Sequence, residues 1–338
     1  MDCHADLASV TEFPHPEKLA RVDCSTCHDD AATKHGASVH SQVAGGKPSA
    51  ACADCHGAHD ILPSANPASR TYHLNVPNTC GTCHGAQGTH GRAPQVSAQY
   101  QDSIHGQALS RRGLLVAPNC ASCHTAHEVR PKADPKSTVH GANVVKTCTT
   151  CHAGIQPAFG RSVHAAALSR GDPRAPTCAS CHTAHGITRT EVERWQLDVV
   201  SECGTCHAES LRTYRDTFHG KVTALGFTRV AKCADCHGAH DILPASNPVS
   251  PISVDRRVET CRKCHASANQ RFATYDPHAD ANDPERSPAL YYTSRFMKGL
   301  LGSVFAFFGI HTLLWFPRSL HARRARNRRE RTSADQEG

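Results

Sequence analysis

The 338-residue sequence has few of the residues that build an ordinary hydrophobic core. Aromatic side chains make up 5% of it, hydrophobic residues of all kinds reach 39%, and there are only two methionines. Strand-forming patterns are nearly absent, and Gly, Pro, Ser, Asn and Asp crowd the intervals between apolar residues. A large core made of side chains alone is therefore not expected, and bound groups can replace it.

Cysteine and histidine, in contrast, are abundant, with 19 and 26 copies. Nine Cys-x-x-Cys pairs use 18 of the cysteines, and a histidine directly follows every pair. This pattern is the attachment signature of c-type haem, in which two thiols bond covalently to the porphyrin and the imidazole binds the iron. The predicted attachment residues are Cys24, Cys27, Cys52, Cys55, Cys80, Cys83, Cys120, Cys123, Cys148, Cys151, Cys178, Cys181, Cys203, Cys206, Cys233, Cys236, Cys261 and Cys264. The predicted proximal iron ligands are His28, His56, His84, His124, His152, His182, His207, His237 and His265.

Two other uses of cysteine fit the pattern less well. Zinc ribbons need Cys-x-x-Cys elements in pairs and do not require histidine at the next position, whereas the number here is odd. A disulfide framework spaces its cysteines more irregularly. Nine covalently attached haem c groups are therefore the predicted cofactors.

The remaining cysteine lies in Cys3-His4, which resembles the second half of a tenth site. Its partner thiol would fall one position before Met1, so we expect a site cut at the start of this sequence. A cut there also explains why no signal peptide is visible, although haem c attachment implies export. The alternative is an isolated cysteine near the amino terminus.

The nine motifs alternate between two types. The first type begins at Cys52, Cys120, Cys178 and Cys233 and carries a trailing histidine three residues after the proximal one. The second type begins at Cys24, Cys80, Cys148, Cys203 and Cys261 and lacks it. The spacing from first to second type is 28, 28, 25 and 28 residues, which indicates an internal two-site repeat.

The sixth ligand of each iron is predicted to be histidine. Met1 and Met297 are the only methionines and neither lies near a motif, so methionine ligation is not expected. The candidate distal ligands are the trailing His59, His127, His185 and His240, and His40, His105, His164, His219 and His278, which follow second-type motifs, mostly as Ser/Thr-x-His. His15, His35, His73, His90 and His140 are further candidates. A trailing histidine lies too close to its own proximal histidine to share an iron with it, so it should reach a neighbouring site.

The predicted fold is mainly irregular, with short helices around a haem-filled core and one transmembrane helix near the carboxyl end. We expect a multihaem domain over residues 1–285, a linker and membrane helix over 286–317, and a basic tail over 318–338. Residues 299–316 carry no formal charge and can span a bilayer, although a buried or interfacial helix is the alternative. A helix is also expected over residues 190–200.

The tail after this segment contains seven arginines and three acidic side chains. By the positive-inside rule it should lie in the cytoplasm, with the haem domain in the periplasm and a single pass through the inner membrane. A nucleic-acid role for the arginines is not favoured. His311 lies inside the apolar segment, where it could contact a quinone or a membrane cofactor, or have no cofactor role.

The alternating motifs resemble the doubled-motif multihaem cytochromes c of respiratory chains, over residues 1–285. Residues 307–320 are similar to the helix that joins such a cytochrome to a membrane b-type cytochrome in quinone-linked complexes. The resemblance implies electron transfer between the quinone pool and periplasmic or extracellular acceptors in anaerobic respiration, with the b-type partner on a separate chain.

Two functions are compatible with these patterns. The first is an electron conduit with no substrate of its own. The second is a multihaem terminal reductase of a nitrogen or sulfur oxyanion, which needs an iron with an open sixth position. No Cys-x-x-Cys-Lys variant occurs and histidines suffice to close every iron, so the conduit is favoured over the reductase and over a sensor or haem-storage role.

Overall fold

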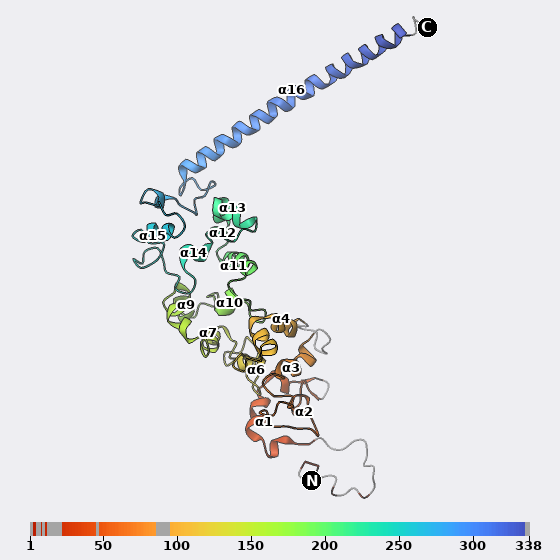
Figure 1. The fold of residues 1–338 in the computed structure, drawn as a ribbon, viewed down its shortest axis with the longest axis vertical. Coiled ribbons are helices and arrows are strands. Elements are labelled where there is room, and N and C mark those ends of the chain that lie inside the picture. The colour runs from red at the N-terminus through yellow and green to blue at the C-terminus, as the bar shows by residue number, and fades with distance from the viewer. Residues whose placement is uncertain are drawn as a thin grey trace.

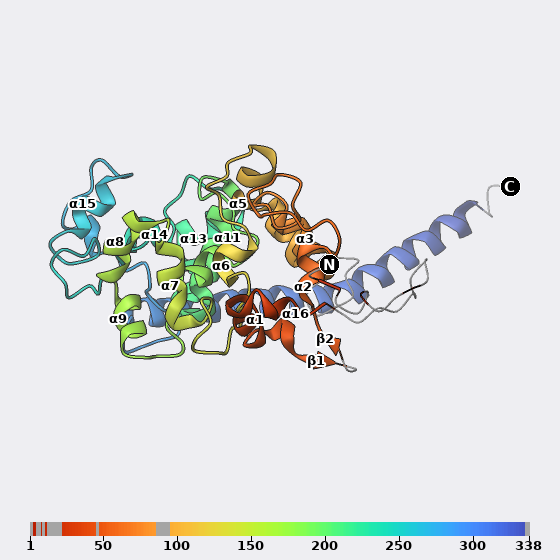
Figure 2. The same cartoon turned by 90° about the horizontal axis from the view of Figure 1, so that it is seen from below.

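The computed structural model describes residues 3, 4, 8, 11, 22–44, 47–85 and 95–334. In these residues, short helices joined by loops form an elongated body (Figure 1). One long helix projects from its carboxyl-terminal end (Figures 1 and 2). The only strands among them, β1 (Val43–Ala44) and β2 (Lys47–Pro48), form a small antiparallel pair. The prediction of short helices, very little strand and one long apolar helix is confirmed.

The two motif types differ in their helices. First-type motifs form separate helices of five residues: α2 (Cys52–His56), α6 (Cys120–His124), α10 (Cys178–His182) and α14 (Cys233–His237). Second-type motifs begin within or near the end of η2 (Cys24–Thr26), α3 (Val76–His84), α7 (Gly141–Thr149), α11 (Glu193–Cys206) and α15 (Arg257–Arg262). The other elements are α1 (Asp29–Gly36), η3 (Val39–Ser41), α4 (Val96–Asp102), α5 (Ile104–Gly106), η4 (Gln107–Arg111), η5 (Ala153–Ile155), α8 (Gln156–Gly160), α9 (Val163–Ser169), α12 (Ala208–Asp216), α13 (Phe218–Ala224), η6 (Phe272–Thr274) and α16 (Pro288–Ala334).

Each first-type helix is closed at its amino end by the third residue of its own motif. In α2 the carboxylate of Asp54 accepts a hydrogen bond from the Ala51 backbone N–H, at 2.7 Å. In α6 the hydroxyl of Ser122 accepts from the Asn119 backbone N–H, at 3.1 Å. Such contacts satisfy N–H groups that a helix start leaves without partners. The short helix therefore holds both thiols and the imidazole in one local geometry.

Side-chain burial is sparse, as the composition predicts. Among the described residues, only eight hydrophobic side chains are buried, with Leu109 and Tyr214 the largest. The chain exposes 24,090 Å², whereas a compact protein of 36.4 kDa exposes about 13,000 Å² by the usual scaling with mass. The protein part alone therefore leaves much of its surface uncovered, both along the projecting helix and inside the body.

The spacing of the motifs reflects two kinds of connection. Three of the four connections from a first-type to a second-type motif contain a turn with Asn or Asp before proline, followed by a buried serine: Ser69, Ser137 and Ser250. Each serine hydroxyl donates to a backbone carbonyl seven residues earlier. The 25-residue connection replaces this turn with α11. The helix expected over residues 190–200 is thus found over Glu193–Cys206, because it continues through two cysteines of the next motif.

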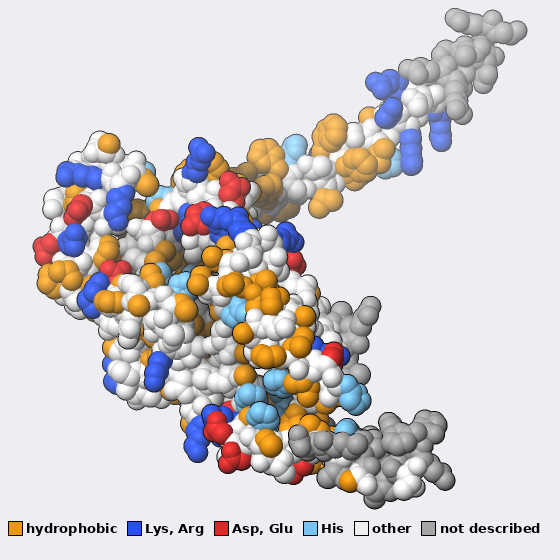
Figure 3. Space-filling view, turned by 60° about the horizontal axis from the view of Figure 1, so that its bottom comes forward, with side chains coloured by type: hydrophobic (Ala, Val, Ile, Leu, Met, Phe, Trp, Pro, Cys, Tyr) orange, Lys and Arg blue, Asp and Glu red, His pale blue; other side chains and the backbone are white. Residues whose placement is uncertain are grey.

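The carboxyl-terminal helix α16 runs without interruption through the predicted membrane segment and the basic tail. Residues 288–329 are long and apolar enough to cross a membrane, with mean hydropathy 1.7 in the best window and none of that window buried. Apolar side chains cover its first part, and Lys and Arg side chains its far part (Figure 3). The helix thus continues past residue 318, because arginines form helix well and continue the preceding turns.

Candidate functional site: a chain of paired histidines

Among the described residues, nine pairs of imidazole rings face one another along the body. In each, the ring centres lie 6.0–6.3 Å apart. The pairs are His4 with His59, His40 with His84, His56 with His127, His105 with His152, His124 with His185, His164 with His207, His182 with His240, His219 with His265, and His237 with His278. Eight of the nine predicted proximal histidines and all nine predicted distal histidines take part.

The spacing within the pairs fits two imidazoles on opposite sides of one metal ion. A metal–imidazole bond is about 2 Å and the ring centre lies roughly 1 Å beyond the nitrogen, which puts two opposed ring centres about 6 Å apart. Imidazoles in direct stacking contact would lie closer. The residues present therefore fit an iron with two histidine ligands, and the porphyrin would supply the other four nitrogens.

The trailing histidines connect successive first-type sites. His127 faces His56 of the preceding first-type motif, and the same relation joins His185 to His124 and His240 to His182. The four pairs that use a trailing histidine have nearly parallel rings, with angles of 9–28° between their planes. A trailing histidine thus faces the proximal histidine of a neighbouring motif and not that of its own motif.

The backbone after each first-type motif turns the trailing histidine away from its own site. The residue after the proximal histidine has a positive φ in all four copies, at Gly57, Thr125, Thr183 and Gly238. Glycine adopts this conformation readily, whereas a β-branched threonine does so only under strain. Gly85, which follows the second-type His84, instead has a φ of −95°. The turn is therefore a property of the sites that carry a trailing histidine.

The distal histidines of second-type sites lie in capped helix starts. His105 and His164 follow Ser103 and Ser162, whose hydroxyls accept from backbone N–H groups three residues later. Thr217 does the same before His219. The four pairs to second-type sites are more crossed, with ring angles of 35–53°. The Ser/Thr-x-His pattern in the sequence is thus a helix-capping pattern that presents an imidazole in the first turn.

The two classes of distal histidine are tied together by backbone hydrogen bonds. Val39 N–H donates to the Val129 carbonyl at 2.8 Å, and Ile104 N–H to the Ile187 carbonyl at 2.8 Å. Val163 N–H donates to the Ile242 carbonyl at 2.9 Å. Each donor precedes a capped histidine, and each acceptor lies two residues after a trailing histidine. The repeat is therefore held by long-range contacts beside its paired rings.

Cysteines of successive motifs also lie close together. The thiols of Cys80 and Cys120, of Cys148 and Cys178, and of Cys203 and Cys233 lie close enough for each contact to shift the pKa of the first thiol upward. In the second of these, the contact raises the pKa of the Cys148 thiol and lowers the pKa of Cys178 to about 7. A further close contact joins Cys24 to Cys52. Second-type motifs are thus in contact with the first-type motifs that follow them.

A continuous, partly open cavity of about 4550 Å³ runs along these motifs. Residues of every motif from Cys24 to His237 line it, together with Cys3 and His4. A cavity for one small ligand is about 300–1,000 Å³, so this volume suits a row of large flat groups. In the space-filling view, histidine side chains lie among apolar ones at several places along the body (Figure 3).

Burial favours neutral imidazoles in the pairs. Burial is the largest cause that lowers the pKa of His105, His164, His219 and His237 below the usual value. In all four, the facing imidazole of the same pair lowers the pKa further. Iron binds neutral imidazole, so these environments favour the form that a ligand needs.

Three of the further candidate histidines have other partners. His73 uses both ring nitrogens, facing the Ala117 carbonyl at 2.8 Å and the Asn119 amide at 3.1 Å. His140 Nδ1 accepts from the Ala142 backbone N–H, and His35 Nε2 lies 3.0 Å from the Ala50 carbonyl. His15 and His90 lie outside the described residues. Within the described part of the chain, no ring pair includes His28.

The sequence patterns do not predict some of the contacts at these histidines. Trp195 stacks on His182 with ring centres 5.6 Å apart, and Phe272 lies 5.0 Å from His265. His4 pairs with His59 as the proximal histidines of later copies do, so the half-motif Cys3-His4 occupies a site-like position. Among the described residues, no three His, Cys, Asp or Glu side chains gather around one point as a metal cluster would.

No protein-family model matches this chain, and no solved structure matches it.

Proposed function

We propose that this chain is a membrane-anchored multihaem c-type cytochrome that conducts electrons. The observation that carries the proposal is the set of nine imidazole pairs with ring centres 6.0–6.3 Å apart, eight of which contain the histidine of a Cys-x-x-Cys-His motif. When bound, haem iron with two histidine ligands supplies one-electron redox chemistry at low potential. Nine covalently attached haems, with a tenth site at Cys3-His4, are the proposed cofactors.

The contacts between motifs favour electron conduction between sites and not a set of isolated redox centres. A cysteine in a haem c site bonds to the edge of its porphyrin, so thiols in contact, such as Cys80 and Cys120, imply porphyrin edges in contact. The trailing histidines add a second link, because one motif helix and its turn contribute ligands to two sites. Electrons can therefore pass along the body without a mobile carrier.

The carboxyl-terminal helix supports a place at the membrane. With the arginine-rich end in the cytoplasm, the haem domain lies in the periplasm and passes electrons between a quinone pool and acceptors beyond the membrane. His311 lies on α16 with its ring 6.5 Å from that of Phe307, and we propose it as a contact for a quinone or for a b-type cytochrome partner.

Haem content and spin state test the proposal directly. The exported full chain should carry at least nine haems in a pyridine haemochrome assay, and its ferric EPR spectrum at low temperature should be dominated by low-spin iron. A yield far below nine, or zinc in place of iron, would reject the cytochrome assignment. A substantial high-spin signal together with reduction of nitrite, hydroxylamine or a sulfur oxyanion would favour the reductase.

A further inference from the structure

The last first-type site differs from the other copies in the source of its second imidazole. His4, His56, His124 and His182 each face the trailing histidine of the next first-type motif. No such motif follows Cys233–His237, and His278 faces His237 instead, with ring centres 6.1 Å apart. The ring angle is 47°, outside the 9–28° of the other four pairs.

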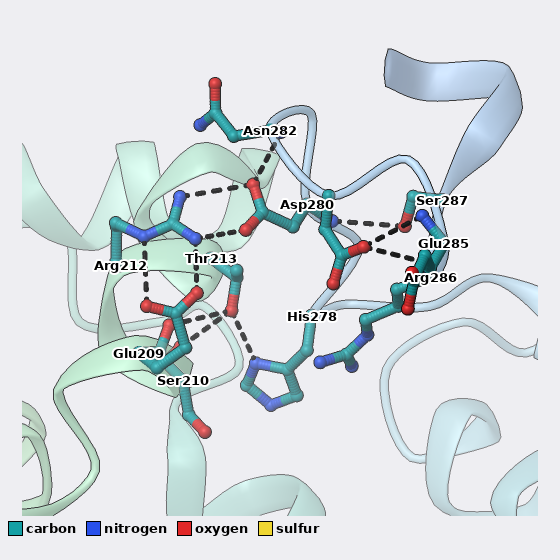
Figure 4. Close-up of polar contacts among 11 residues, drawn as sticks. Glu209, Ser210, Arg212, Thr213, His278, Asp280, Asn282, Glu285, Arg286 and Ser287 are labelled. Atoms are coloured by element: carbon teal, nitrogen blue, oxygen red, sulfur yellow. Dashed lines mark hydrogen bonds and ion pairs between the residues drawn. The ribbon is translucent and has the colours of Figure 1, made fainter.

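A buried threonine orients the ring of His278. Thr213 Oγ1 lies 3.1 Å from His278 Nδ1, and Thr213 is 1% exposed (Figure 4). The same hydroxyl donates toward the carbonyls of Glu209 and Ser210, at 3.2 and 3.1 Å. A hydroxyl has one proton to donate, so it accepts from His278 Nδ1–H. This leaves Nε2 as the nitrogen with a free lone pair for the site it shares with His237.

An ion pair beside this contact fixes the loop that carries His278. Arg212, the neighbour of Thr213 on α12, pairs with both oxygens of Asp280, two residues after His278 (Figure 4). Asp280 is 7% exposed, and Arg212 is the largest cause that holds the pKa of its carboxyl below the usual value. Asp280 also accepts from the Asn282 backbone N–H at 2.8 Å.

The rest of the loop leads directly into the membrane helix. Ser287 Oγ accepts from the Asp280 backbone N–H at 3.2 Å, and Arg286 pairs with Asp276 at 3.4 Å. Pro288 then begins α16. The polar segment over residues 276–287 is therefore a hydrogen-bonded loop, because its Asp and Ser side chains bond to nearby backbone groups. The position of His278 is thus linked to the position of the helix start.

Earlier copies of α12 lack this pair of side chains. An aromatic residue precedes the capped histidine by five positions in three copies, as Tyr100, Phe159 and Tyr214. The two residues before the aromatic are Ala98 and Gln99, then Pro157 and Ala158, and finally Arg212 and Thr213. Among these three copies, Arg followed by Thr occurs only in α12, the copy beside the site that has no trailing histidine.

We propose that Thr213, Arg212 and Asp280 are positioning residues that hold His278 as the second iron ligand opposite His237. The membrane-linking loop thereby completes the terminal first-type site, which makes ligation there sensitive to the position of α16. The inference rests on the proposed function, since it assigns a ligand geometry at one of the proposed haems.

The test uses the exported, haem-loaded full chain. Thr213→Val and Asp280→Asn should each leave haem content unchanged, and convert about one haem per chain from low-spin to high-spin ferric EPR signal. Thr213→Ser, which keeps the hydroxyl, should retain the parent spectrum. Asp172→Asn, in the exposed ion pair with Arg174, is the matched control and should also leave it unchanged.

A further variant tests the same site independently, in case Thr213→Val or Asp280→Asn misfolds. His278→Met should leave haem content unchanged and raise the reduction potential of one haem in a redox titration, because methionine ligation raises the potential. Parent-like EPR spectra of Thr213→Val and Asp280→Asn at full haem content would overturn the proposal, as would an unchanged titration of His278→Met. Low haem content in the parent chain would instead reject the cytochrome function itself.

Discussion

Pairs with a trailing histidine and pairs with a capped histidine have the same separation of ring centres but different angles between the ring planes. The first have ring angles of 9–28° and the second 35–53°, although the separation of the ring centres is the same. A trailing histidine leaves a short helix through one fixed turn, whereas a capped histidine projects from the first turn of another helix. The local backbone thus sets the angle between the ring planes. The site that the two rings share sets the distance between their centres.

The pair of His237 with His278 shows which feature controls the angle. Its proximal histidine belongs to the first type, yet its ring angle of 47° falls within the range of the capped pairs. The distal histidine comes from a loop and not from a trailing turn. The source of the distal residue therefore decides the class, and the type of motif does not.

Removing one distal imidazole from each class should have the largest effect. In the haem-loaded chain, His127→Gly should leave the site of His56 with one ligand, and His105→Gly should do the same to the site of His152. We expect about one high-spin haem per chain in each variant by ferric EPR, reversed by added imidazole. His73→Gly is the control, because hydrogen bonds occupy both nitrogens of His73. Low-spin spectra in both variants would contradict the pairing.

The parent chain should give two groups of low-spin signals. Ring orientation affects the electronic structure of haem iron, so near-parallel imidazoles should give rhombic EPR spectra and crossed ones more anisotropic spectra. The five crossed pairs, including that of His278, should contribute more of the anisotropic component than the four near-parallel pairs. One uniform rhombic signal would show that the two classes do not persist in the loaded protein.

Loss of a helix cap at a capped histidine should destabilise the protein. Ser103 is 1% exposed and caps the turn that presents His105, so Ser103→Ala should destabilise the protein by about 1 kcal/mol. Chemical denaturation of the loaded protein, followed by far-UV circular dichroism, measures the loss. Ser110→Ala, which removes a hydroxyl that donates within a helical turn, is the comparison and should have a smaller effect. Equal losses would mean that capping has no special role at His105.

The positive-φ turn should give the smallest effect. Thr125 has a φ of 65° and its hydroxyl is buried without a hydrogen-bond partner, so Thr125→Gly should relieve strain and stabilise the protein by up to about 1 kcal/mol. The converse change Gly57→Thr should destabilise it, because a β-branched residue is strained at the φ of 84° that Gly57 adopts. Thermal unfolding measures both. A stabilising Gly57→Thr would contradict this account of the turn.

Much of the site was predictable from residue spacing because the relevant contacts are local. Cys-x-x-Cys-His fits one helical turn, and Ser/Thr-x-His fits one helix cap. The uncharged stretch before the arginines predicts the apolar part of α16 for the same reason. The folded loop over residues 276–287 was not predicted, because polar and proline-containing segments of similar composition also form open linkers.

The sequence alone determined the motifs, the two histidine patterns and the apolar helix, since each depends on residues within a few positions of one another. Only the tertiary structure decided that His127 meets His56, that His4 takes part, and that His278 replaces a missing trailing histidine. These partners lie far apart in the chain. Their meeting depends on long-range backbone contacts, such as that of Val39 with Val129, and on the Arg212–Asp280 ion pair. A short sequence motif does not specify which distant residues form such contacts.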